Sequence, residues 1–305
     1  MRAVALGLYP GTADPNATYD RMVDEIAAVG ATHVALVVSW AQHDVRSVRI
    51  GPRRDQTVPD ALVRRVAERA RDRGLAVILF PILLLDQNRP GEWRGTIAPA
   101  DPTAWWRQYE AFILHYADLA ATTRADVLFV GSELGSTEGW RERWQHLVGQ
   151  AKRRFTGRIA YSANWDHYQK VSFWRRLDIL GVTGYFKLTR HRDAGVAELT
   201  RAWGEARKAL LAFATQRPGP ALWLSEVGYV SRDGAATRPW DYTLSSKIDL
   251  EEQRRCYEAL RRTWTGTAEL GGVVIWNWLG NGGPRDGGYT PRGKPAEREL
   301  RAWFR

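Results

Sequence analysis

Short apolar runs alternate with longer helical patterns along the whole chain, and this alternation restricts the fold more than any other feature. Eight runs have the length and composition of buried strands, at 4–8, 33–39, 76–81, 127–131, 158–162, 179–183, 222–225 and 273–276. Such runs are typical of parallel strands covered on both faces. The helical patterns lie at 19–29, 60–73, 105–121, 139–153, 169–175 (a short one), 195–215, 250–263 and 296–303. This order indicates repeated βαβ units around a parallel sheet.

Eight such units without a linker favour a closed barrel over an open sheet. The chain has 305 residues, somewhat more than the roughly 250 typical of an eight-fold α/β barrel. An open dinucleotide-binding sheet would carry G-x-G-x-x-G after its first strand, where this chain has Gly7-Leu8-Tyr9-Pro10-Gly11. We therefore expect an α/β protein with a (β/α)8 TIM barrel, a single domain over residues 1–305, and no cofactor.

Charge and cysteine content argue against several other classes of protein. The formal net charge is +10, but the arginines are spread through helical patterns such as 62–69 and form no single block. This spread is typical of a solvated outer face, so we expect no nucleic-acid partner. Cys256 is the only cysteine, which excludes a disulfide framework and a cysteine metal cluster.

The first residues predict a strand and not a targeting segment. The apolar run within 2–9 is shorter than a signal-peptide core and is followed by a turn at Pro10-Gly11. No stretch reaches the roughly 20 apolar residues that cross a bilayer, so we expect a soluble protein without a membrane partner. The compartment stays open between the cytoplasm and secretion after removal of a signal segment, and the sequence does not indicate the oligomeric state.

Two glutamates end apolar runs and would lie at the tips of strands. Glu133 ends the run 127–133, and Glu226 ends the run 221–226. A carboxylate in such a place is costly to desolvate unless it has a function. In a (β/α)8 barrel the C-terminal ends of the strands carry the active site, and the fourth and seventh strands approach it from opposite sides. We predict that the two glutamates face each other across the barrel mouth and perform paired acid chemistry.

Aromatic and polar side chains occur at the same depth on other strands. Flat rings stack on the C–H faces of sugars, and amides or carboxylates bond to hydroxyls, so the combination indicates a carbohydrate substrate. Long loops at roughly 41–58, 85–102 and 227–249 should wall the site. The predicted substrate-binding residues are Trp40, His43, Ser132, Asn164, Trp165, Lys187, Trp240, Trp276 and Trp278. Five other tryptophans, Trp105, Trp106, Trp144, Trp203 and Trp264, are predicted to fill space between helices and barrel.

The strand ends also resemble a known group of enzymes. Glu133, Tyr185, Glu226 and Trp276 match the positions of functional residues in the retaining glycosidases of glycoside hydrolase clan A, which are (β/α)8 barrels. Within that clan the chain is most similar to family 113, whose members are β-1,4-mannanases, in the segments 130–134, 224–229 and 289–296. The resemblance implies an endo-β-1,4-mannanase with Glu133 as acid/base, Glu226 as nucleophile and Tyr185 as a hydrogen-bond donor to the nucleophile.

The implied mechanism has physical consequences. Two neighbouring carboxyl groups do not both ionise easily, and we expect the proton on Glu133 while Tyr185 keeps Glu226 charged. Double displacement requires the carboxyl groups to lie roughly 5–5.5 Å apart.

Two positions depart from the clan pattern. Ser132 stands where most members have an asparagine before the acid/base. No arginine near the end of an early strand can be assigned as a partner of the nucleophile, because Arg46 and Arg49 are predicted to be surface charges.

Other chemistries have weaker support. The pairs His43-Asp44 and Asp166-His167 lack a metal-ligand spacing, so we expect no metal and predict sugar contacts or loop hydrogen bonds for them. A carbohydrate-binding barrel without turnover and a retaining glycosidase for another glycan both stay open. Nothing in these residues separates an axial from an equatorial 2-hydroxyl, so mannan follows from the resemblance alone.

Overall fold

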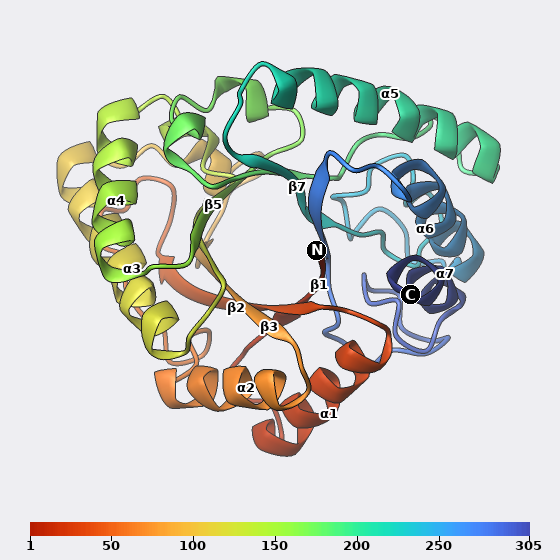
Figure 1. Cartoon of the computed structure of the whole chain (residues 1–305), viewed down its shortest axis with the longest axis horizontal. Helices are drawn as coiled ribbons and strands as arrows, with labels where there is room; N and C mark the ends of the chain where they lie inside the picture. Colours follow the sequence, from red (N-terminus) through yellow and green to blue (C-terminus); the bar gives the residue numbers. More distant parts are fainter.

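A computed structural model describes residues 1–305 and contains a closed barrel of eight parallel strands (Figure 1). The strands are β1 (Arg2–Gly7), β2 (His33–Gln42), β3 (Ala76–Leu85), β4 (Val127–Ser132), β5 (Arg158–Ala163), β6 (Ile179–Thr183), β7 (Ala221–Val227) and β8 (Leu270–Ile275). Each pairs with its neighbours in sequence, and β8 pairs with β1 to close the ring. The predicted fold class is confirmed.

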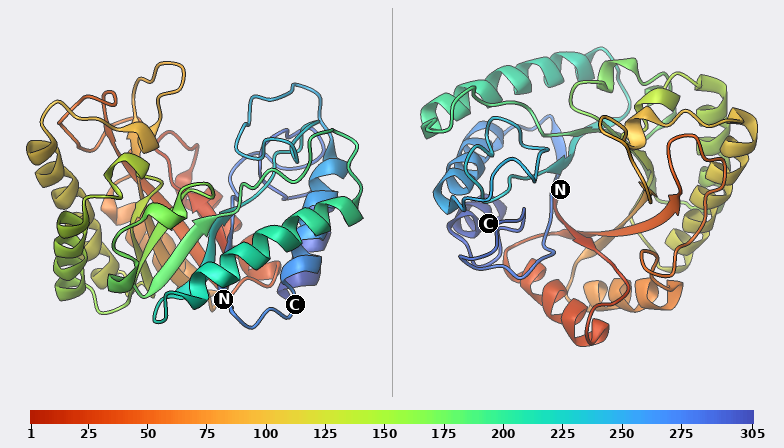
Figure 2. Two further views of the ribbon diagram at one scale, coloured as in Figure 1. Left: turned by 90° about the horizontal axis from the view of Figure 1, so that it is seen from above. Right: turned by 180° about the vertical axis from the view of Figure 1, so that it is seen from behind.

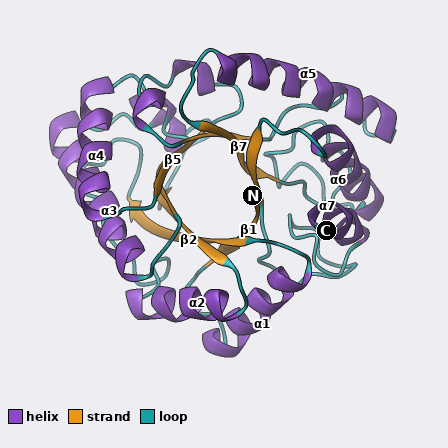
Figure 3. Cartoon of the chain, viewed as in Figure 1, coloured by secondary structure: helices purple, strands orange, loops and turns teal.

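Seven α-helices surround the strands (Figure 3). They are α1 (Pro15–Ala28), α2 (Asp60–Asp72), α3 (Pro102–Thr122), α4 (Arg141–Arg154), α5 (Val196–Thr215), α6 (Leu250–Trp264) and α7 (Pro295–Phe304). Three begin at an aspartate whose side chain accepts a hydrogen bond from a backbone amide of the first turn: Asp14, Asp101 and Asp249. Such caps satisfy amides that have no partner within the helix.

The short helix predicted at 169–175 is wrong. Two separate 3-10 turns, η3 (Tyr168–Lys170) and η4 (Trp174–Arg176), take its place between β5 and β6. Val171 between them has an extended backbone, and the next amide, of Ser172, donates to the Glu138 carbonyl. The segment therefore bonds across to the loop after β4 and not to its own preceding turn.

Apolar side chains pack in two layers, inside the barrel and between the barrel and the helices. Phe80 and Phe129 stack inside the barrel with ring centroids 4.1 Å apart. The outer layer holds the five tryptophans predicted to fill this space, and all are buried. Because both faces of each strand are covered, the apolar runs show little alternation along the chain.

The loops that follow the strands form one end of the barrel. In Figure 2 (left), the loops after β3 and after β7 rise from the end opposite the two chain termini. The C-terminal ends of the strands therefore lie beneath the longest loops, where an α/β barrel carries its active site. No helix combines the length and the apolar character needed to span a bilayer.

Candidate active site

Glu133 and Glu226 lie at this end of the barrel on opposite sides of the ring. Glu133 directly follows β4, Glu226 is the penultimate residue of β7, and their exposed fractions are 7% and 2%. The Ser132 hydroxyl, next to Glu133 in sequence, donates a hydrogen bond of 3.0 Å to Oε1 of Glu226. The ends of β4 and β7 therefore meet through a direct contact between side chains.

Irregular pairing at both strand ends aims these side chains. The register shifts between Phe129 and Ser132 on β4, and again between Leu224 and Val227 on β7. Glu133 has a φ of 55°, a left-handed conformation that is rare outside glycine. Bulges at barrel rims redirect a side chain relative to the regular strand.

Arg94 completes the charged group, and sequence reasoning missed it. It begins the turn η1 (Arg94–Thr96) in the loop after β3, and its Nη2 donates to Glu133 Oε2 at 2.8 Å. The arginine expected from the clan pattern was sought near the end of an early strand. Arg46 and Arg49 are exposed, in agreement with their prediction as surface charges.

The groups around Glu226 act on its pKa in opposite directions. Burial, and then the charge of Glu133, raise the pKa of Glu226 to about 8, against the opposing effects of Arg94, Ser132 and Tyr185. Burial alone would lower the pKa of Arg94, but the charges of Glu133 and Glu226 raise it overall. The raised pKa of Glu226 opposes the expectation that Tyr185 keeps Glu226 charged, whereas the expected proton on Glu133 stays a prediction.

Tyr185 follows β6 and reaches the second oxygen of Glu226. Its hydroxyl donates to Oε2 over 3.4 Å, a long hydrogen bond. Burial raises the pKa of Tyr185 well above its usual value, so the hydroxyl keeps its proton and remains a donor. The ring of Tyr289 lies against that of Tyr185, with centroids 6.2 Å apart, and had not been assigned to the site from the sequence.

Three of the predicted substrate-binding residues form an aromatic and cationic cluster. Trp165 follows β5, Lys187 follows β6 and Trp240 lies in the loop after β7. The rings of Trp165 and Trp240 are stacked with centroids 5.4 Å apart, and Lys187 Nζ lies 5.4 Å from the Trp240 ring. Trp240 is 38% exposed, so part of this ring remains free for a ligand.

Three further predicted residues lie near strand ends and have either an exposed side chain or a polar atom without a hydrogen-bond partner. Trp276 directly follows β8, is partly buried and packs on the cluster inside the barrel. Asn164 directly follows β5, and its buried Oδ1 has no hydrogen-bond partner. His43 follows β2 and is exposed.

Trp40 and Trp278 do not point toward the mouth, so their prediction as substrate-binding residues is wrong. Trp40 packs on α3, with ring centroids 5.4 Å from Phe112 and 5.3 Å from His115. Trp278 is buried in the outer layer, and its Nε1 donates to Glu25 of α1 at 2.8 Å. Both side chains occupy the outer face of the barrel, which they share with the helices.

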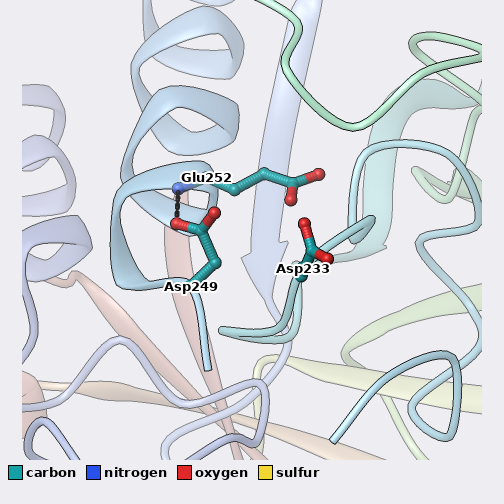
Figure 4. Close-up of side chains that lie close together, drawn as sticks. All are labelled: Asp233, Asp249 and Glu252. Carbon is teal, nitrogen blue, oxygen red and sulfur yellow. Dashed lines mark hydrogen bonds between the residues drawn. The ribbon is translucent and has the colours of Figure 1, made fainter. Parts of the chain in front are cut away.

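A separate acidic cluster has a structural explanation. Figure 4 shows Asp233, Asp249 and Glu252, whose carboxylate oxygens lie within 4.8 Å of one another. Asp233 accepts from Arg192 at 2.7 Å, and Asp249 caps α6 by accepting from the Glu252 amide at 2.8 Å. Glu252 accepts from the backbone amides of residues 234 and 236. These bonds tie the loop after β7 to the start of α6.

Comparisons with known proteins find solved structures of the same fold. A GH113 β-mannanase, AaManA from Alicyclobacillus acidocaldarius in complex with ManMIm, is 25% identical with a TM-score of 0.86, covering 100% of this chain and 96% of that one. The complex structure of another GH113 β-1,4-mannanase is 22% identical with a TM-score of 0.84, covering 99% and 97%. A GH5_18 protein from Streptomyces cattleya in complex with GlcNAc shares only the fold, at 14% identity and a TM-score of 0.60, covering 94% and 74%. No curated protein sequence matches the chain.

The family comparison is more specific than these structural similarities. The sequence pattern of Glycoside Hydrolase Family 113 matches residues 11–288, a range that includes both glutamates, Arg94 and Tyr185. This chain is therefore a glycoside hydrolase and belongs to glycoside hydrolase family 113.

Proposed function

We propose that the protein is an endo-β-1,4-mannanase that cleaves its substrate with retention of configuration. The observation that carries the proposal is the buried pair Glu133 and Glu226 at the ends of β4 and β7, with Arg94 beside it. Paired carboxyl groups across a barrel mouth match the requirements of glycosidic bond cleavage. The solved β-mannanases of the same family support mannan as the substrate.

In the proposed mechanism Glu226 is the nucleophile and Glu133 is the acid/base. Glu226 attacks the anomeric carbon while Glu133 donates its proton to the leaving oxygen, so that the glycosidic bond breaks and a glycosyl ester forms. Glu133 then accepts a proton from water as the water oxygen attacks the same carbon. The ester bond to Glu226 breaks, and two inversions restore the original configuration.

The proposed mechanism needs a charged Glu226, although burial raises the pKa of this group in the free protein. Glu226 has a pKa of about 8 in the free protein, and Arg94 pairs with Glu133. The reactive form has the proton on Glu133 and the charge on Glu226. The bonds from Ser132 and Tyr185 stabilise the charge on Glu226.

The remaining predicted residues supply substrate contacts in this proposal. Trp240, supported by Trp165 and Lys187, offers an exposed ring for stacking against a sugar face. The buried Asn164 Oδ1 lacks a partner in the protein and suits a sugar hydroxyl. Trp276 packs on the side chains of the barrel interior and keeps part of its ring exposed.

The release of reducing ends from mannan, glucomannan, β-glucan, xylan and galactan tests which polysaccharide the enzyme cleaves. NMR of the first product tests retention, because a retaining enzyme initially releases the β-anomer.

Glu226→Ala should abolish turnover, whereas Glu133→Gln should spare aryl glycosides whose leaving group needs no proton. The exposed Glu68→Gln on α2 is a control for charge removal and should leave activity unchanged. Near-normal activity of Glu226→Ala, or retention on mannan without cleavage by the wild type, would contradict the proposal.

A further inference from the structure

The backbone around Glu133 requires support from the surrounding structure. A non-glycine residue with a φ of 55° carries conformational strain, which persists only where neighbouring contacts over-determine it. The Glu133 amide donates to the Ser162 carbonyl of β5 at 2.7 Å. The following amide, of Leu134, donates to the Tyr161 hydroxyl at 3.0 Å. Two adjacent residues of β5 therefore hold the two peptide groups that flank the Glu133 Cα atom.

Tyr161 points to the outer face of the barrel, whereas Ser162 points inward. The Tyr161 ring packs against Trp144 and Phe173, with centroids 5.2 and 5.1 Å away. Its hydroxyl donates to Glu138 Oε1 at 2.8 Å. A hydroxyl has one proton, and the Leu134 amide already occupies one of its lone pairs. The proton must therefore point to Glu138, which fixes the direction of both bonds at the Tyr161 hydroxyl.

Glu138 is fully buried and joins Tyr161 to a histidine. Its Oε2 lies 2.6 Å from His167 Nδ1, and its carbonyl accepts from the Ser172 hydroxyl at 2.7 Å. Burial raises the pKa of Glu138, while the bonds from His167 and Tyr161 oppose this shift. His167 lies in the segment between β5 and β6. Its contact with Glu138 confirms the prediction of a loop hydrogen bond for this residue.

The same histidine also contacts the turn after Glu133. A Cβ built at Gly135 would lie 3.5 Å from the His167 ring and 3.3 Å from the Gly95 carbonyl. Gly95 is adjacent to Arg94, the ion-pair partner of Glu133. The turn at 135–137 is thus enclosed between the His167 ring and the turn that carries Arg94.

We propose that Tyr161, Glu138 and His167 are positioning residues that hold Glu133 in its left-handed conformation and so aim its carboxyl group at the leaving oxygen. This inference rests on the proposed role of Glu133 as acid/base. None of the three contacts the substrate. They act on Glu133 through the hydrogen bond between the Leu134 amide and the Tyr161 hydroxyl. Their loss should impair proton donation selectively, whereas a purely structural role would affect all substrates equally.

The first experiment compares Tyr161→Phe with the matched control Tyr109→Phe. Tyr109 is also buried, and its hydroxyl donates to the Val130 carbonyl of β4 at 2.8 Å, so its loss also removes one buried hydrogen bond beside the same strand. The substrates are 2,4-dinitrophenyl and phenyl β-mannobioside, of which only the second needs a proton on its leaving group. For Tyr161→Phe we expect kcat/KM to fall about ten- to a hundredfold on the phenyl substrate and less than about threefold on the dinitrophenyl one. Tyr109→Phe should change both by the same factor.

His167→Gln is a second variant in case Tyr161→Phe does not fold. The His167 side chain is partly exposed, so replacement is tolerated sterically, and we expect a smaller loss with the same preference for the phenyl substrate. Equal losses on both substrates, or no loss, in the variant that folds would overturn the proposal.

Hydrogen–deuterium exchange of the segment 132–139 tests the positioning without any substrate. Tyr161→Phe should accelerate exchange there because the Leu134 amide loses its acceptor, and Tyr109→Phe should not. Unchanged exchange would overturn the inference. If the wild type cleaves neither mannobioside but exchange accelerates as expected, the proposed function fails while the positioning of the segment stands.

Discussion

Arg94 and Glu133 form an ion pair with 2.8 Å between Nη2 and Oε2, although they come from different loops of the barrel. Arg94 also lowers the pKa of the nearby Glu226, so a single cation acts on both carboxyl groups. The two carboxyl groups therefore share one counter-charge.

Replacing Arg94 with methionine should move the pH profile of activity upward. Arg94 opposes the rise in the pKa of Glu226, so without it Glu226 retains its proton to higher pH. Because the nucleophile must be charged, we expect the acidic limb of kcat/KM against pH to shift up by about one unit. The control is Arg89→Met, on the same loop and exposed, which should leave the limb in place. A downward shift for Arg94→Met would exclude this electrostatic role.

Glu226→Gln should stabilise the protein increasingly as the pH rises. The pKa of Glu226 is about 8 in the folded protein and 4.5 in the reference state, so folding favours its protonated form. The contribution is fully present below pH 4.5 and is lost as the pH rises through about 8. Glutamine does not titrate, so the difference in unfolding free energy between variant and wild type should grow across this window, by an amount on the order of a few kcal/mol.

Chemical denaturation at pH 5 and pH 8 measures this difference. Glu68→Gln, at an exposed position on α2, is the control and should show no comparable change between the two pH values. A constant difference for Glu226→Gln would show that the folded protein does not favour the protonated carboxyl group.

Trp278→Phe should reduce stability without weakening substrate binding. The buried indole donates to Glu25, and phenylalanine would lose that bond and leave unfilled space beside α1. We expect a loss of about 1–3 kcal/mol in unfolding free energy, with KM unchanged on the best substrate of the panel. A raised KM with normal stability would indicate that Trp278 contacts the substrate after all.

Much of the barrel was predictable because strand and helix patterns alternate regularly in the sequence. The strands β2 and β3 nevertheless continue to Gln42 and Leu85, beyond the predicted ends at 39 and 81. Proline lacks an amide donor, yet Pro81 lies within β3. β3 pairs with β4 only at Ile78 and Leu79, so its later residues need fewer donors on that side.

The direction of rim side chains was harder to predict than the strands. Strands buried on both faces are apolar throughout, so the period-two pattern that separates inward from outward positions is lost. Trp40 and Trp278 were predicted to line the mouth only because they lie near the ends of their strands, and both point outward. Arg94 was missed for another reason, since only the folded loop after β3 brings it to Glu133.

Trp240→Ala should weaken substrate binding while leaving stability nearly unchanged. Its ring is 38% exposed and is held in place by Trp165 and Lys187, so a sugar can stack on it without rearrangement of the loop. Aromatic stacking contributes about 0.5–1.5 kcal/mol, which corresponds to a roughly two- to twelvefold rise in KM. The control is Tyr242→Ala, at a 66% exposed position on the same loop, which should not change KM. Equal effects of the two variants on KM would indicate that loop mobility, and not stacking on Trp240, controls binding at this side of the mouth.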